Sequence, residues 1–174
     1  MTPNNFTPFH SQSIPGISIQ NYLKRISKGS GCSNQCFTMA LIYIDRLIVK
    51  NQNFIANSHC IHRIILMSVM IAAKYYDDFY YNNENWAFVG GIPLTEINKL
   101  EIEYLFLLHF DLSIDPDKYT IYYNKLMESY KTIPQTNTDS NNNSNNNDNN
   151  NSNSNDAAPK TSKPKVVPKQ KHRE

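Results

Sequence analysis

Apolar side chains recur every three or four residues along most of the chain as far as Tyr130, which is the spacing of amphipathic helices. A first helix is predicted over residues 17–28, and Gly29 and Gly31 end it. Ser33 is a suitable N-cap for a second helix. Its apolar stripe, at spacings of four, three and four, consists of Phe37, Leu41, Ile44 and Ile48.

A third helix, capped by Asn57 or Ser58, is apolar on nearly all sides and carries small residues among the large ones. Such a helix is buried, so we expect it at the centre of the domain. A polar and aromatic connection follows Tyr76. A fourth helix is predicted from Leu94 to about Phe110, and a fifth from Pro116 to about residue 131. Strand-like alternation is absent, so the predicted fold class is all-α, with about five helices around a central third helix.

Composition divides the chain into a domain and a tail. Every aromatic residue lies between Phe6 and Tyr130, whereas residues 137–155 contain 12 Asn among 19 residues. Such a tract cannot bury enough apolar area to offset the entropy lost on ordering it. We therefore predict an extended N-terminal arm over 1–13, a helical domain over 14–133 and a disordered tail over 134–174 that is dispensable for partner binding.

The formal net charge of +2 originates in the tail. Six basic residues follow Asn155 against Asp156 and Glu174, whereas acidic and basic residues nearly balance within the domain. A basic nucleic-acid-binding domain is therefore not indicated. The basic segment is consistent with either a nuclear-import signal or a solvated tail, and the sequence leaves both open.

Several classes of protein are excluded. The longest apolar run, Ile64–Ala73, is about half as long as the roughly 20 residues of a membrane span. No signal-peptide pattern opens the sequence. Three cysteines without a secretory signal indicate a reducing compartment. The sequence thus predicts an intracellular protein of the cytoplasm, the nucleus or both, with no membrane partner.

Searching for catalytic chemistry finds no phosphate-binding glycine loop and no metalloprotease or hydrolase motif. Cys36 with His59 or His62 is a nucleophile–base pair of a kind that arises by chance. Cys32, Cys36 and Cys60 with these histidines do not have the usual zinc spacing, so free cysteines are the better interpretation. We predict no enzyme, no cofactor, no metal site and no small-molecule substrate.

Charges stand where the helical pattern expects apolar residues. Lys74 continues the apolar side of the third helix, and Glu101 interrupts the stripe of the fourth. Two interpretations remain open, a structural ion pair and a pair of anchors for a partner protein. Asp45 flanks the core stripe of the second helix, and the nearest plausible mate is Arg25, so we also predict an ion pair between these two residues.

Five strings in order closely resemble a cyclin box, namely YLKRI (22–26), ALIYIDRL (40–47), HRIILMSVMIAAKYYDD (62–78), VGGI (89–92) and LEIEYLFLLHFDL (100–112). The resemblance covers about residues 14–127. It is strongest to the cyclins of the fungal phosphate-response system and the plant P/U-type cyclins, and more distant to cyclin Y. It implies the cyclin fold and a regulatory subunit, not itself catalytic, that binds and activates a cyclin-dependent protein kinase.

The resemblance also implies functional residues. Lys74 and Glu101 stand at the family's kinase-contact positions, and Ile71, Tyr75 and Tyr104 supply apolar kinase contacts on this interpretation. Asp45 stands where the family's Asp holds an Arg of the first helix. The substrate-docking string of mitotic cyclins is absent. The alternative function is a cyclin-fold transcription or adaptor protein that binds nucleic acid or other proteins without a kinase.

Overall fold

A computed structural model describes residues 7–132 and 166–168. The elements in chain order are α1 (Ile19–Ser30), α2 (Gln35–Lys50), α3 (Ile61–Tyr76), β1 (Phe79–Tyr81), α4 (Asn83–Gly90), α5 (Leu94–Leu107), α6 (Pro116–Thr132) and β2 (Val166–Pro168). Among the described residues, nearly all of the regular secondary structure is helical, which confirms the all-α fold class. Apart from β2, the predicted disordered tail lies outside the described residues.

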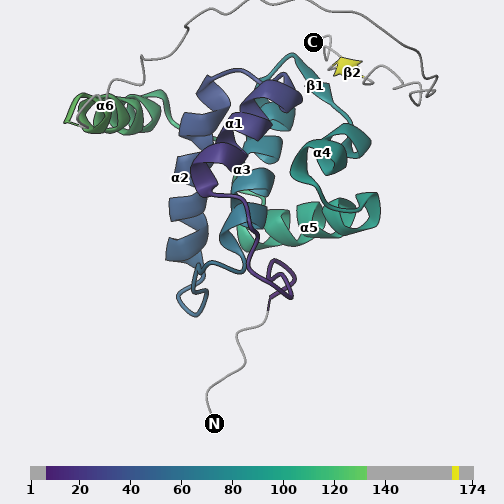
Figure 1. The fold of residues 1–174 in the computed structure, drawn as a ribbon. Helices are drawn as coiled ribbons and strands as arrows, with labels where there is room; N and C mark the ends of the chain where they lie inside the picture. The colour runs from purple at the N-terminus through teal and green to yellow at the C-terminus, as the bar shows by residue number, and fades with distance from the viewer. Residues whose placement is uncertain (1–6, 133–165, 169–174) are drawn as a thin grey trace, which may run out of the picture.

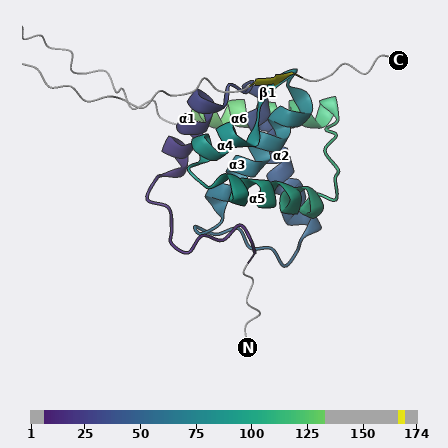
Figure 2. The same ribbon diagram turned by 90° about the vertical axis from the view of Figure 1, so that its right-hand side faces the viewer.

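The third helix is the centre of the molecule, as predicted. His62 and the whole run Ile64–Ala73 of α3 are buried. Helices α1, α2, α4 and α5 pack around it, and α5 runs across it (Figures 1 and 2). This arrangement follows from the sequence, because a helix that is apolar on all sides has to be covered on all sides.

The connection after α3 contains a helix that the periodicity did not predict. Helix α4 is capped by Asn82, whose side chain accepts a hydrogen bond from the backbone N–H of Asn85, and it ends at Gly91 with a φ of 70°. Trp86 is fully buried. A Cβ on Gly90 would lie 2.3 Å from a side-chain carbon of Leu66, so glycine is what allows α4 to approach α3 this closely.

Two strands depart from the predicted absence of β-structure. The three residues of β1, between α3 and α4, pair antiparallel with β2, with Tyr80 opposite Val167. This short ladder joins a segment of the tail region to the helical domain.

Helix α5 ends three residues earlier than predicted. His109 and Phe110 both have a φ of 55°, the left-handed region, which non-glycine residues adopt at a cost of about 1–2 kcal/mol each. The backbone N–H of Phe110 donates to the carbonyl of Leu105 at 2.9 Å, so the chain turns back over the end of the helix. Contacts elsewhere must hold this turn in place.

The C-terminal half of α2 provides those contacts. The Arg46 guanidinium donates to the Asp111 carboxylate at 3.1 Å, to the backbone carbonyl of Asp111, and to the carbonyl of Ser113 at 2.9 Å. The Lys50 ammonium binds the other carboxylate oxygen of Asp111 at 3.0 Å. The hydrogen bond from Lys50, with the charges of both basic groups, lowers the pKa of Asp111.

The same end of α2 also caps α5. Lys50 donates to the carbonyl of Leu108 at 3.1 Å, and the Asn51 amide donates to the carbonyl of Leu107 at 3.0 Å. Carbonyls at the end of a helix have no partner within the helix, so these side chains satisfy them. We refer to Arg46, Lys50 and Asn51 with Asp111 as the α2–α5 clamp.

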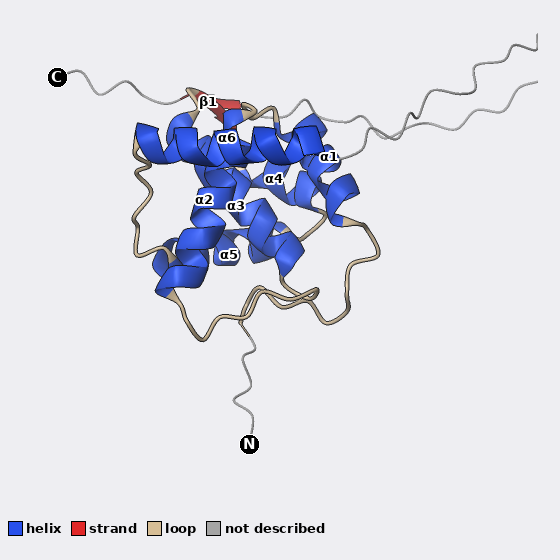
Figure 3. Ribbon diagram, turned by 90° about the vertical axis from the view of Figure 1, so that its left-hand side faces the viewer, coloured by secondary structure: helices blue, strands red, loops and turns tan. Residues whose placement is uncertain are grey.

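The predicted Arg25–Asp45 ion pair is wrong. Arg25 donates to the backbone carbonyl of Phe88 at 3.0 Å, and Asp45 accepts from the Tyr122 hydroxyl at 2.7 Å. The physical reason is helix packing. Helix α1, with Arg25, packs on α4 and α3. Helix α6 lies across α2, so its Tyr122 is the neighbour of the exposed Asp45 (Figure 3).

We predict that Arg46→Ala destabilises the protein by about 1–3 kcal/mol, because it removes the donor of the part-buried Asp111 carbonyl and one of the two basic partners of the Asp111 carboxylate. Asp45→Ala, one residue away but exposed, is the matched control and should cost less than about 1 kcal/mol. Urea unfolding of both variants gives the two values.

The loss of unfolding free energy in Arg46→Ala should depend on pH. Because the folded-state pKa of Asp111 is lowered, its contribution to stability is complete above the unfolded pKa of about 3.9 and disappears as the pH falls through the folded value. The difference between wild type and Arg46→Ala should therefore narrow below about pH 4. Equal losses of unfolding free energy in Arg46→Ala and Asp45→Ala would contradict the stabilising role of the α2–α5 clamp.

Candidate functional site

The two interrupting charges identified in the sequence meet in the structure. The Lys74 ammonium, in the last turn of α3, lies 2.6 Å from a carboxylate oxygen of Glu101 on α5. Their side chains are 22% and 18% exposed, so the pair lies at the edge of the core and faces solvent in part. An ion pair in this position is screened less than one on the open surface.

Asn83, the first residue of α4, completes the site. Its amide oxygen accepts from the Lys74 ammonium, and its amide nitrogen donates to the second carboxylate oxygen of Glu101 at 2.6 Å. The same nitrogen donates to Asn98 of α5 at 2.7 Å. The cluster thus connects three helices, and contacts within the chain alone fix the positions of both charged groups. Sequence reasoning missed Asn83, although the Asn82 cap with Glu84 in the first turn is a helix-start signal.

Exposed apolar side chains follow the two charged residues along α3 and α5. Tyr75 follows Lys74 and is 46% exposed, while its ring contacts that of Tyr76 at 4.9 Å. Ile102 follows Glu101 and is 57% exposed, and Phe106 lies one turn further along α5 at 61%. We define the α3–α5 surface as Lys74, Tyr75, Glu101, Ile102 and Phe106.

The left-handed turn extends this surface. Phe110, which is exposed, stacks its ring edge-to-face on that of Phe106 at 5.2 Å. The α2–α5 clamp, which holds that turn, therefore also sets the position of Phe110 relative to the α3–α5 surface.

Two of the predicted apolar contacts are not on this surface. Ile71 is 3% exposed and Tyr104 is fully buried. The Tyr104 hydroxyl bonds to the Ser68 hydroxyl, its ring packs edge-to-face against Phe9, and burial raises its pKa. The burial of Ile71 and Tyr104 contradicts the prediction that they supply apolar kinase contacts, because their apolar stripe is the core-facing side of the helices. Both residues belong to the core that holds α3 and α5 in place.

The cysteines and histidines do not form the sites considered for them. Cys36, at the start of α2, donates to Asp77 at the C-terminal end of α3, and neither His59 nor His62 is its partner. Cys60 is the N-cap of α3 and Asp77 its C-cap, so the helix places them roughly 25 Å apart. Across residues 7–132 and 166–168 no group of metal-ligating side chains is close enough to hold an ion.

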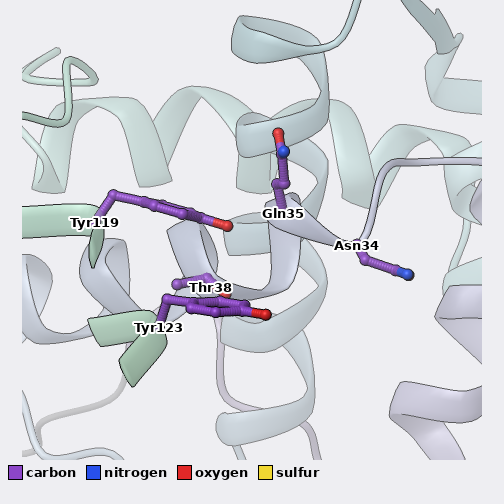
Figure 4. A pocket seen from close by; sticks show the side chains of 5 residues that line it. All are labelled: Asn34, Gln35, Thr38, Tyr119 and Tyr123. Atoms are coloured by element: carbon purple, nitrogen blue, oxygen red, sulfur yellow. The ribbon is translucent and has the colours of Figure 1, made fainter. Parts of the chain in front are cut away.

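A pocket of about 400 Å³ lies between the start of α2 and α6 (Figure 4). It is lined by Asn34, Gln35, Thr38, Tyr119 and Tyr123. These residues lie on different helices from the Lys74–Glu101 pair. Among the helices of the described chain, none has the length and apolar character needed to cross a membrane.

Comparison with known proteins agrees with this architecture. The family model "Cyclin" matches residues 2–112, so the chain belongs to the cyclin family. Family membership supports a cyclin regulatory role and confirms the resemblance noted in the sequence.

Among curated proteins the chain is similar to plant cyclins. It is 44% identical to Cyclin-U4-1 of Arabidopsis thaliana over 120 residues, 69% of this chain and 59% of that protein. It is 45% identical to Cyclin-U3-1 of the same plant over 118 residues, 68% of this chain and 53% of that protein. With Cyclin-P4-1 of Oryza sativa subsp. japonica it shares 40% identity over 114 residues, 66% of this chain and 54% of that protein. The chain thus spans little more than half the length of these relatives.

We predict that Lys74 and Glu101 stabilise the fold mainly through each other. Lys74→Ala should cost about 1–3 kcal/mol, because it leaves the half-buried Glu101 carboxylate with amide donors only. The double variant with Glu101→Ala should cost less than the sum of the two single changes, with a coupling of about 1 kcal/mol or more. Additive costs in urea unfolding would mean that the ion pair contributes nothing in solution.

Proposed function

We propose that this chain is a cyclin that binds and activates a cyclin-dependent protein kinase through the α3–α5 surface. The observation that supports this most directly is the preformed cluster of Lys74, Glu101 and Asn83 next to exposed apolar side chains. A cluster of this kind combines the two properties of an interface centre, apolar area and a few directed polar groups.

The apolar part supplies most of the affinity on this proposal. Tyr75, Ile102 and Phe106 expose about half or more of their side chains, and burial of one such side chain is worth roughly 1.5–3 kcal/mol. The three together therefore contribute a few kcal/mol, and the directed polar contacts and the rest of the interface have to offset the remaining cost of association. Aromatic anchors near the centre of an interface are also the usual hot spots.

On this proposal the charged groups determine the orientation in which the kinase binds. A lysine ammonium has three N–H donors, and within the described chain Lys74 uses two of them, on Glu101 and Asn83. The third donor is available for a backbone carbonyl of the kinase, and each Glu101 oxygen retains a lone pair for a backbone N–H. Because Asn83 already fixes both side chains, little rotamer entropy is lost on binding.

Activation follows from where such a surface binds. A protein kinase is active when its β3 lysine pairs with the glutamate of helix αC and its activation segment is ordered. A rigid helical surface that packs against αC favours the paired arrangement and shifts the population toward it. In this mechanism the cyclin contributes no catalytic group, and its role is to change the conformational equilibrium of the kinase.

The test is a charge reversal that keeps the intramolecular pair. In the double variant Lys74→Glu with Glu101→Lys, the Asn83 amide can rotate to exchange its donor and acceptor, so the fold should be retained. The charges that face the kinase are then reversed. We expect a loss of affinity corresponding to about 2–5 kcal/mol, with an unchanged unfolding midpoint. The kinase is the one that the wild-type chain retains from cell lysate, purified and then titrated.

The matched control is a second ion pair between the same two helices. Arg63 of α3 and Glu96 of α5 lie 2.6 Å apart and are 17% and 30% exposed, but they are not part of the α3–α5 surface. Reversal of this pair should leave kinase binding intact. Wild-type affinity in both folded variants would contradict the proposed surface. Retention of nucleic acid and no kinase by the wild-type chain would favour the adaptor alternative.

A further inference from the structure

The edge of β1 is occupied by a segment that comes from outside the helical domain. The three residues of β1, Phe79–Tyr81, pair antiparallel with Val166–Pro168 of β2, and Tyr80 lies opposite Val167. β1 closely follows the central helix, whereas β2 belongs to the tail region beyond residue 165 (Figure 2). The β1 edge thus accepts an extended segment that is distant in sequence.

Packing within the domain holds β1 in place. The strand packs on α3 and α4, and Tyr81 is partly buried against the core. Gly31, which follows α1 with a φ of 61°, leaves room for the Tyr81 ring, because a Cβ there would lie 3.0 Å from a ring carbon. A two-stranded ladder on its own is marginal in water, so this packing is what makes β1 a stable template for a second strand.

Two exposed carboxylates flank β1. Asp78 immediately precedes the strand, and Glu84 follows it in the first turn of α4. Within residues 7–132 and 166–168, no ion pair involves either carboxylate. An edge bounded by two such negative charges favours a segment of positive charge.

The sequence around β2 has that charge. Residues 163–171 read KPKVVPKQK, with four lysines, two adjacent valines and no acidic residue. Valine is β-branched and favours an extended strand, and proline, which has no backbone N–H, is suited to the end of a ladder. The Asn-rich tract at 137–155 contains neither lysine nor valine. Charge and strand propensity therefore select the same segment that the structure pairs with β1.

The ladder is too short to hold a partner tightly from solution. Three paired residues on each side provide few main-chain hydrogen bonds, and exposed ion pairs contribute little to affinity. A segment on the same chain reaches an effective concentration of up to about 1 mM, so weak pairing is enough to keep it on β1. The occupant that fits these magnitudes is the chain's own tail.

We propose that β1, together with Asp78 and Glu84, is a docking site for extended basic peptides, and that residues 163–171 of this chain occupy it as a tethered ligand. A second protein that binds β1 through such a peptide has to displace this segment first. The inference does not depend on the proposed kinase partner.

The experiment follows the backbone amides of β1 by NMR in the full, isotope-labelled chain, with circular dichroism as the check of folding. The double variant Val166→Gly with Val167→Gly keeps every charge of the tail and removes its strand propensity. We expect this variant to retain the helical signal. The amides of Phe79–Tyr81 should change their chemical shifts, because the tail leaves the edge.

The opened edge should then bind the same sequence from solution. The probe is a synthetic peptide of residues 160–171, KTSKPKVVPKQK. It should bind the double variant about tenfold or more tightly than the wild-type chain, in which the tethered segment competes. The same peptide with glycine in place of both valines has unchanged charge and should bind the double variant about tenfold or more weakly.

Charge reversal tests the two carboxylates. Asp78→Lys with Glu84→Lys, introduced into the glycine variant, should weaken peptide binding by about tenfold. Asp117→Lys with Glu128→Lys on α6 is the matched control, because it changes two exposed carboxylates by the same net charge, and it should leave binding unchanged. Unmoved β1 amides in the glycine variant, equal peptide affinity of that variant and the wild-type chain, or equal weakening by the two charge reversals would overturn the proposal.

Discussion

The burial of α3 is the constraint on which the rest of the structure depends. This sixteen-residue helix has eleven buried residues, more than any other helix, and burial of each large side chain is worth roughly 1.5–3 kcal/mol. Four helices have to surround it, and the chain reaches that arrangement only with close approaches such as Gly90 on Leu66 and with the left-handed turn after α5. The α2–α5 clamp then holds the turn that the core geometry requires.

The proposed kinase-binding surface lies where this burial ends. Lys74 is the first residue of α3 after the buried run, so its stem lies on the core while its ammonium reaches the surface. Glu101 and Asn83 meet it there because α5 and α4 cover the same end of α3. The charges are therefore fixed by the packing that makes the core, and the exposed Tyr75, Ile102 and Phe106 lie on the outer side of the same helices. Regulation through such a surface requires rigidity, which the cluster provides.

Sequence reasoning succeeded where one helix carried the signal. The central α3 and the interrupting charges Lys74 and Glu101 follow from periodicity, and the five cyclin-like strings identified the family. It failed where the outcome depends on how helices pack. The eight-residue α4, and with it Asn83, is too short for a periodicity signal, and the partner of Asp45 was decided by where α6 lies. The apolar stripe containing Tyr104 was located correctly, but it was assigned to the partner-binding surface and lies in the core. Periodicity locates the apolar face of a helix without showing what covers that face.

Hydrogen exchange of the chain alone and with the proposed kinase partner tests the central claim most directly, since it maps the interface without substitutions. The account predicts added protection of amides in the last turn of α3 and along α5 to the Phe110 turn. Amides around the pocket between α2 and α6 should exchange at the same rate in both samples. Protection confined to the α2–α6 side, with α5 unchanged, would contradict the assignment of the α3–α5 surface.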